Sequence, residues 1–509
     1  MKLHLTKPSR PKASPGRRCP AVGSGGRWQK AAATVMLSAG MSPVFAGPPA
    51  ISVPIASQSG GQASDSFLFL SNLERSNFFL GDMFGVRPAL GTCGMTLAVQ
   101  ETSEMLGNVS GGMKRGAAYD GLTQVILQMD TQRAFGLYGG LFNMSVLNLH
   151  GTNFSAENLG TLQTASGIAS NRATRLWELW YEQKFLEEDR LSLRVGQQSA
   201  DAEFMVSSNA LFFVNTMMGW PAVPSYDLPG GGPAYPLSAP AIRARYRVGN
   251  AVNLLVGVFN GSPAKTNDGD AQEENNHGTS FPMHNGTLTF AELQYVYPSV
   301  GSLVYPGEKA PLSRTYKLGA WYNSQSFDHL RRDAKGLSLA DPASDGTPAT
   351  ARGNLSIYAV ADQMLWRNEE DPNNTLSAFM RVMGTPQTDR NEVTFSLNAG
   401  LVCRGPLKNR ANDTFAVGMG FVRVGSQAAG LDRDTAQFAQ ASGDSGYYPV
   451  RSSETFIEAT YQCQVTPWLQ IQPDIQYVWN PGGGVANPTA PARRIGNELV
   501  LGVRANILF

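Results

Sequence analysis

The last twelve residues, ELVLGVRANILF (Glu498–Phe509), decide the fold class. One face of this segment is apolar and holds Leu499, Leu501, Val503, Ala505, Ile507 and Phe509. The opposite face is mainly polar and holds Glu498, Gly502, Arg504 and Asn506. A two-residue period with one oily and one wet side is typical of a β-strand.

The same alternation continues upstream through most of the chain. It predicts sixteen strands, at 92–100, 121–131, 134–148, 174–185, 191–204, 241–248, 251–260, 286–297, 314–323, 353–366, 375–384, 392–403, 413–424, 453–465, 469–479 and 495–509. Short connections such as 186–190, 249–250 and 466–468 alternate with long polar ones such as 151–173, 205–240 and 423–452. This asymmetry is typical of an outer-membrane barrel, which has tight periplasmic turns and long external loops.

Composition excludes several classes of protein. Charged residues make up 16% of the 509 residues, and no uninterrupted apolar stretch of about 18 residues occurs, which excludes a bundle of membrane-spanning helices. A soluble β-sandwich also alternates, but aromatic residues at many strand ends, including Tyr246, Tyr322 and Trp479, suit two membrane interfaces. We therefore predict an all-β fold, a transmembrane antiparallel up-and-down β-barrel of about sixteen strands.

The N-terminal sequence predicts a secretory leader. Residues 1–46 hold eight basic side chains and no acidic one, followed by an apolar stretch that ends in Val44-Phe45-Ala46. Without the leader, 33 Lys and Arg remain against 40 Asp and Glu, a net charge of −7 that gives nucleic-acid binding no electrostatic basis. The predicted organisation is a signal peptide at 1–46, a periplasmic segment at 47–91 and a barrel at 92–509.

Several segments together resemble a known family. TRLWELWYEQKF (174–185) is followed by LSLRVGQQSADAEF (191–204), GGGPAYPLSAPAIRARYRV (230–248) and NLLVGVFNGSP (253–263). Their order and spacing resemble the carbohydrate-selective porins of the OprB family. The resemblance implies a sixteen-stranded barrel in the bacterial outer membrane that passes mono- and oligosaccharides by passive diffusion. It also implies recognition of a closing Phe509 by the barrel assembly machinery.

Register arguments indicate which side chains face the channel. Arg243, Arg245 and Arg247 alternate with apolar residues, and an Arg on the lipid face costs about 2–4 kcal/mol at the bilayer midplane, so all three are expected inside. By the same test, Trp177, Leu179, Tyr181 and Phe185 are expected to face lipid. The predicted sugar-contacting lining is Glu178, Trp180, Glu182, Arg194, Asp201, Glu203, Arg243, Arg245 and Arg247. Carboxylates accept and guanidiniums donate hydrogen bonds to hydroxyls, and Trp offers a flat apolar face to a sugar ring. For any one of these residues, simple solvation of a wet lumen is the competing interpretation.

The Gly- and Pro-rich stretch Met205–Pro240 is the predicted constriction. By resemblance, the porin loop at this position folds into the barrel, so Trp220, Tyr226, Asp227 and Tyr235 are its candidate narrowing residues. An external loop that packs on its neighbours is the competing interpretation.

Other functions have weaker support in the sequence. Gly443-Asp444-Ser445-Gly446 matches a serine-nucleophile string, but no histidine lies in a matching context, so neither a catalytic residue nor an enzyme is predicted. A barrel hydrolase and a plugged structural or adhesin barrel are the alternatives. No metal site or cofactor is predicted, and Cys403 and Cys463 are expected to be free thiols on the lipid face. The expected partners are sugars as solutes and outer-membrane lipid, and the oligomeric state is left open between a monomer and a homotrimer.

Overall fold

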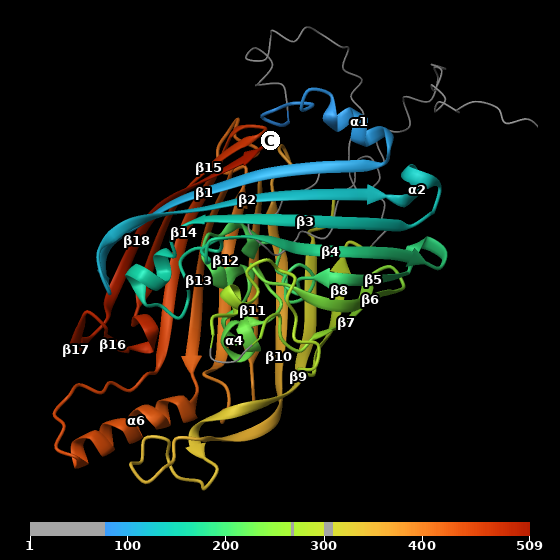
Figure 1. The fold of residues 1–509 in the computed structure, drawn as a ribbon. Coiled ribbons are helices and arrows are strands. Elements are labelled where there is room, and N and C mark those ends of the chain that lie inside the picture. Colours follow the sequence, from blue (N-terminus) through green and yellow to red (C-terminus); the bar gives the residue numbers. More distant parts are fainter. Residues whose placement is uncertain (1–76, 266–268, 300–308) are drawn as a thin grey trace, which may run out of the picture. The chain divides into compact units, whose positions relative to one another are not determined.

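A computed structural model describes residues 77–265, 269–299 and 309–509. Within them, sixteen antiparallel strands form a closed barrel in which each strand pairs with its sequence neighbours and β1 pairs with β18 (Figure 1). The barrel strands are β1 (Met95–Gly112), β2 (Gly116–Asp130), β3 (Gly140–Gly151), β4 (Ala173–Phe185), β5 (Leu191–Gln198), β6 (Ala239–Val248), β7 (Val252–Asn260), β8 (Thr287–Tyr297), β9 (Arg314–Asp333), β10 (Pro348–Arg367), β11 (Thr375–Gly384), β12 (Val393–Arg404), β13 (Thr414–Val424), β14 (Ser453–Thr466), β15 (Leu469–Trp479) and β18 (Gly496–Leu508). The predicted fold class is confirmed.

Shorter elements lie in the connections. The helices are α1 (Val86–Thr92), α2 (Thr131–Phe135), α3 (Thr216–Gly219), α4 (Ala222–Asp227), α5 (Ala271–Glu274) and α6 (Ser426–Ala441). A small hairpin joins β16 (Ala486–Asn487) to β17 (Ala490–Arg494) in the connection from β15 to β18. No helix of the described residues is both long and apolar enough to cross a bilayer.

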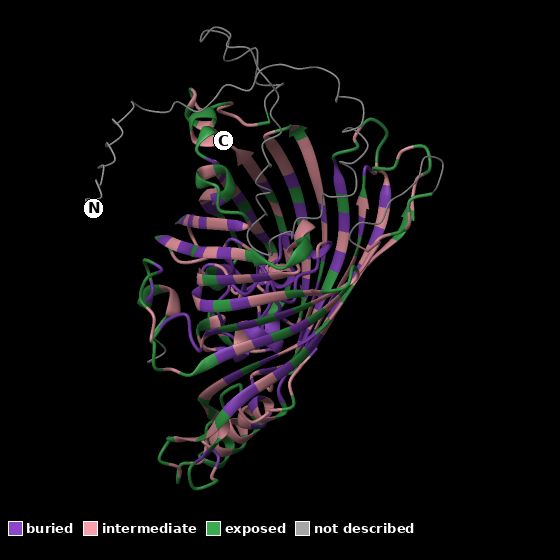
Figure 2. Cartoon of the chain, turned by 90° about the vertical axis from the view of Figure 1, so that its right-hand side faces the viewer, coloured by how far each residue is buried: buried purple, intermediate pink, exposed green. Residues whose placement is uncertain are grey.

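On β6 and β18 the outer face of the wall is apolar, as the alternation predicts. Ile242, Tyr246 and Val248 on β6 are exposed, whereas Arg243 between them is fully buried. On β18, Leu501 and Val503 point outward, and Arg504 is buried. Buried and exposed residues accordingly alternate along the strands (Figure 2). The described cysteines, Cys93, Cys403 and Cys463, are free, in agreement with the prediction for the last two.

One orientation was predicted wrongly. Trp177 was expected to face lipid but is buried, and its ring meets that of Tyr235 edge to face. The pairing of β3 with β4 shifts between Ser145 and Val146, so that Trp177 is the extra residue of a β-bulge. A bulge reverses the inside–outside alternation on one side of it. A prediction that assigns odd and even residues to opposite faces along the whole strand cannot detect this reversal.

The segment before β1 and the end of β18 are hydrogen-bonded to each other at the rim with the short turns, called here the short-turn rim. The Phe509 amide donates to the Val99 carbonyl (2.9 Å), and the Phe79 amide donates to the Leu508 carbonyl (2.8 Å). Arg87, in α1, donates to the Phe509 carbonyl oxygen. The predicted leader and the first part of the predicted periplasmic segment lie outside the described residues, so this division of the N-terminus stays a prediction.

Candidate functional site

Two long connections lie inside the barrel rather than outside it. We call residues 199–238, between β5 and β6, the inner loop, and residues 152–172, between β3 and β4, the companion loop. The inner loop carries α3 and α4, and α4 lies within the ring of strands (Figure 1). The inner loop begins at residue 199, earlier than the predicted start at 205, because β5 ends at Gln198.

Charged side chains of the wall hold the inner loop across the interior. On β10, Asp362 accepts a hydrogen bond from the Ser207 hydroxyl (2.7 Å). On β14, Glu458 accepts hydrogen bonds from the amides of Val214 (2.5 Å) and Asn215 (3.2 Å). Because these strands lie across the barrel from β5, the loop spans the lumen.

Arg381, on β11, makes four hydrogen bonds to this loop. Its guanidinium donates to the carbonyl oxygens of Met205 (3.1 Å), Met217 (2.5 Å), Met218 (3.0 Å) and Gly219 (2.9 Å). The side chain is buried, and the several N–H donors of its guanidinium satisfy four loop carbonyl groups that would otherwise be buried without a partner.

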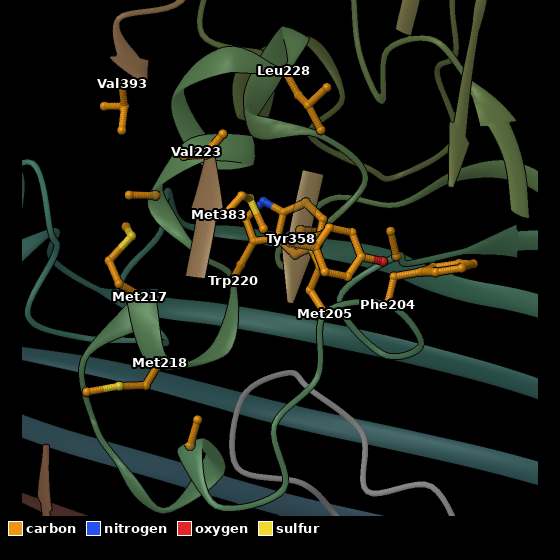
Figure 3. Packing of buried hydrophobic residues seen from close by; sticks show 14 of the residues in the cluster. Phe204, Met205, Met217, Met218, Trp220, Val223, Leu228, Tyr358, Met383 and Val393 are labelled. Carbon is orange, nitrogen blue, oxygen red and sulfur yellow. The ribbon is translucent and has the colours of Figure 1, made fainter. Parts of the chain in front are cut away.

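Apolar packing adds to these polar contacts. Phe204, Met205, Trp220, Val223 and Leu228 of the inner loop form one buried cluster with wall residues (Figure 3). The wall contributes Phe290, Trp321, Tyr358, Phe379 and Met383, among others. The interior is therefore not wet throughout, contrary to the simplest form of the prediction, because the loop supplies its own apolar surface to the inner wall.

The predicted lining residues of β4, β5 and β6 form one ion-pair network with the start of the inner loop. Arg194 lies 2.7 Å from Glu182 and 2.8 Å from Glu203, and Arg243 lies 2.8 Å and 3.1 Å from the same two carboxylates. Arg245 lies 2.8 Å from Glu203. Three guanidiniums thus share two carboxylates, and Glu203 is the loop's contribution.

Trp180 and Glu178 extend this network. The Arg194 guanidinium lies 3.8 Å from the centre of the Trp180 ring, a cation–π contact, and the Trp180 indole donates to Glu178 (3.2 Å). Glu178 also accepts from the amide and the hydroxyl of Ser199, both at 3.0 Å. These contacts fix the first residue of the inner loop to β4.

Exposure divides the nine predicted lining residues into two groups. Glu178, Trp180, Glu182, Arg194, Asp201, Glu203 and Arg243 are buried. Arg245 and Arg247 keep 28% and 18% of their side-chain surface, and Arg247 lies 3.6 Å from Glu188 in the turn after β4. The structure brings most of the predicted residues together. They pair mainly with one another, and few of them keep surface that a solute could contact.

The four predicted narrowing residues join the two inner segments to each other and to the wall. The hydroxyl of Tyr226 donates to Leu162 (2.8 Å) and that of Tyr235 to Ile168 (2.9 Å), both carbonyls of the companion loop. Asp227 accepts from the Val393 amide on β12 (3.3 Å), and the Trp220 indole donates to Gly231 within the loop (2.9 Å). A cavity of about 50 Å³ remains between the segments, with Asp201, Trp220, Tyr235 and Arg504 in its lining.

Burial changes the acidity of the loop carboxyl groups. Desolvation raises the pKa of Asp201 to about 7 and raises that of Asp227 well above its ordinary value. Desolvation acts on Glu203 in the same direction, but Arg243, Arg194 and Arg245 outweigh it and lower the pKa of Glu203. Glu203 is thus held as a carboxylate.

Sequence reasoning missed the wall residues that hold the loops. They include Glu104, Glu292, Asp362, Arg381, Glu454, Glu458 and Arg504. One signal was present: Arg381 is the only charged residue in the apolar strand TLSAFMRVMG. An isolated charge at an inward position of such a strand indicates a buried partner.

Comparisons with known proteins agree with this architecture. The model of the carbohydrate-selective porin, OprB family, matches residues 114–509. Porin B of Pseudomonas aeruginosa is 24% identical over 449 residues, which cover 85% of this chain and 92% of that protein. A putative porin, QuiX, of Acinetobacter baylyi is 21% identical and covers 80% of this chain and 89% of its own length.

A solved structure has the same fold. The high-pH structure of Pseudomonas putida OprB superposes with a TM-score of 0.73 at 21% identity, covering 85% of this chain and 99% of that one. Because the family model spans more than half of the chain, family membership follows directly. The chain belongs to the carbohydrate-selective porins of the OprB family, and it is an outer-membrane porin rather than an enzyme.

Proposed function

We propose that mono- and oligosaccharides diffuse passively through this barrel past a fixed narrowing that the inner loop forms. The observation that carries the proposal is the set of wall charges, on β10, β11 and β14, that pins the loop across the lumen. A loop held by buried charged groups keeps its position, so the aperture is constant without a gate.

The ion-pair network has a positioning role in this proposal. Glu182, Glu203, Arg194 and Arg243 satisfy one another, so they set the position of the loop start and leave few hydrogen-bonding groups for a solute. Arg245 and Arg247 retain exposed surface and are the predicted donors to sugar hydroxyls. Transport requires weak, successive contacts, because a solute that binds tightly does not leave.

Membrane orientation and partners complete the proposal. The short-turn rim faces the periplasm, and the rim with the long connections faces outward, as the porin pattern predicts. Outer-membrane lipid surrounds the apolar wall, and Phe509 is the residue that the barrel assembly machinery recognises. Light scattering of the purified protein would distinguish a monomer from a homotrimer.

A plugged barrel is the second candidate, and one observation favours it. The inner and companion loops bond to each other through Tyr226 and Tyr235, and wall residues Glu454 and Glu458 accept hydrogen bonds from them, so part of the lumen is filled by protein.

Planar-bilayer recording of the purified chain, titrated with glucose and maltose, decides between the two. A steady ion current that each sugar reduces in a saturable manner is the result expected of a sugar porin. Silence of a correctly folded barrel would favour the plug, and a current indifferent to both sugars would contradict sugar selectivity.

A further inference from the structure

A groove with a cationic edge lies at the rim opposite the short-turn rim, called here the long-connection rim, where the turn between β1 and β2 meets the companion loop. It has a volume of about 600 Å³, and its lining includes Lys114, Arg115, Tyr119, Glu157 and Arg172. Lys114 lies 3.8 Å from Glu157, the one carboxylate among the residues that line the groove, whereas Lys114, Arg115 and Arg172 supply three cations. The groove therefore carries an excess of positive charge.

Arg172 is held in place at this edge. Its Nε donates to the carbonyl of Gly151, the last residue of β3 (2.5 Å), and the rest of its exposed guanidinium stays available. A guanidinium with a fixed orientation presents paired donors, a geometry that suits a phosphate group.

Below the groove, polar groups occupy the outer face of the wall where lipid is expected. The Tyr119 hydroxyl lies 3.0 Å from the Ser103 hydroxyl and 3.2 Å from His150 Nε2. His150 Nε2 in turn lies 3.3 Å from Glu101, which also accepts from Ser103 (3.1 Å). These residues come from β1, β2 and β3, and they form one hydrogen-bonded patch.

Gly121 makes this patch possible. A Cβ at this position would lie 2.2 Å from His150 Nε2 and 2.7 Å from the Tyr119 hydroxyl, so only glycine lets the imidazole lie across β2 toward Glu101. Glu101 also accepts from the Thr123 hydroxyl (2.5 Å). The patch is thus a built feature of the wall rather than a few isolated polar residues.

The wall becomes apolar again nearer the short-turn rim. Val99, Val125 and Val146 lie opposite one another on β1, β2 and β3, two residues from Glu101, Thr123 and Asn148. From the rim downward, this part of the wall offers cations, then hydroxyl and imidazole groups, then aliphatic side chains. An amphiphile with phosphates, sugar hydroxyls and acyl chains has its groups in the same order.

We propose that this outer wall of β1, β2 and β3 binds a phosphorylated glycolipid of the outer leaflet. Lys114, Arg115 and Arg172 contact its phosphates, Tyr119, Ser103 and His150 contact its hydroxyl and amide groups, and the valines contact its acyl chains. A second copy of the chain fits this surface less well. Copies that share one membrane would place their cationic rims at the same depth, and like charges repel.

The size of the expected effect follows from the number of cations. A basic side chain near an anionic membrane surface contributes about 1 kcal/mol, which is about fivefold in affinity. Replacing three should therefore weaken binding roughly 100-fold. Removing one phosphate from the lipid should weaken it by a smaller factor in the native chain and have little effect in the variant.

The test is native mass spectrometry of the full chain in detergent, titrated with diphosphoryl lipid A, monophosphoryl lipid A and inorganic phosphate. The variant Lys114→Ala/Arg115→Ala/Arg172→Ala is compared with Arg133→Ala/Lys309→Ala/Lys408→Ala. This control loses the same net charge from the short-turn rim. Thermal unfolding and the sugar-dependent channel current establish that each variant is folded, and they are independent of lipid binding.

We expect the native chain and the control to bind the diphosphoryl lipid equally and the first variant to lose the binding. Equal binding by all three chains, or equal loss in both variants, would overturn the proposal. Competition by inorganic phosphate at the same concentration as the lipid would identify a simple anion site instead. An oligomer present in the native chain and abolished in the first variant would identify the wall as a contact between copies.

Discussion

Replacing Arg381 by methionine tests whether the wall sets the aperture. Methionine has a similar length and no charge, so the substitution removes the donors to Met205, Met217, Met218 and Gly219 while leaving the β11 ladder intact. Each buried carbonyl left without a partner costs about 1–3 kcal/mol, which gives an upper bound of roughly 4–12 kcal/mol for a rigid loop. Relaxation toward water limits the loss to about 3–5 kcal/mol, as for one partner removed from a buried charged contact.

A loss of this size should loosen the inner loop around Met217–Gly219, while Asp362 and Glu458 still hold Ser207, Val214 and Asn215. We expect a larger single-channel current, more current noise and weaker block by maltose in planar bilayers, with barrel strand content by circular dichroism unchanged. Arg423→Met on β13, which removes an exposed arginine, is the matched control and should behave as the native chain does. If Arg381→Met is folded and its current and sugar block equal those of the native chain, the loop does not depend on this contact, and the reasoning about the aperture fails.

The remaining predictions concern the ion-pair network, pH and the lipid face. Glu203→Gln leaves three guanidiniums with one carboxylate and should lower the free energy of unfolding by about 3–5 kcal/mol, measured by urea titration, whereas a loss below 1 kcal/mol would show that the network contributes little. Asp201 has a pKa of about 7 in the folded chain against 3.8 unfolded, so the folded state holds the extra proton and loses stability as pH rises through this window. Asp201→Asn should remove that loss, and the melting temperature of the variant relative to the native chain should rise between pH 4 and 7; a constant difference would contradict the assignment. Leu318→Arg on the lipid face of β9 should cost about 2–4 kcal/mol in vesicle refolding, whereas Leu318→Met should cost little.

Sequence alternation predicted the wall well because each strand meets two different environments. The strands at 375–384 and 469–479 agree with the structure at both ends, and the inward Arg243 follows from the cost of the opposite register. The end of the strand predicted at 191–204 was wrong, since β5 stops at Gln198. Residues 199–204 continue the alternation of polar and apolar residues, but they leave the wall, and Glu203 joins the ion-pair network.

The interior could not be predicted in the same way. The inner loop has no period, and its contacts join residues more than a hundred positions apart, as between Ser207 and Asp362. Residue types identified candidates such as Glu203 and Tyr235. They did not reveal that Glu203 pairs with Arg194 and that the Tyr235 hydroxyl donates to the companion loop. Exposure, which decides whether a group can meet a solute, depends on that packing.

The ring closes between β1 and β18, and Arg504 of the last strand pairs with Glu104 of the first and donates to Val214 of the inner loop. These partners are about 400 residues and 290 residues apart in the chain, so the contacts are highly non-local and are expected to form late in folding. The narrowing formed by the inner loop is therefore expected to be completed late in folding. A precursor in which the first and last strands have not yet paired lacks the contacts of Arg504 with Glu104 and Val214. Pore size and closure of the barrel are thereby linked. A folding intermediate whose first and last strands are unpaired is expected to conduct ions without selecting solutes by size.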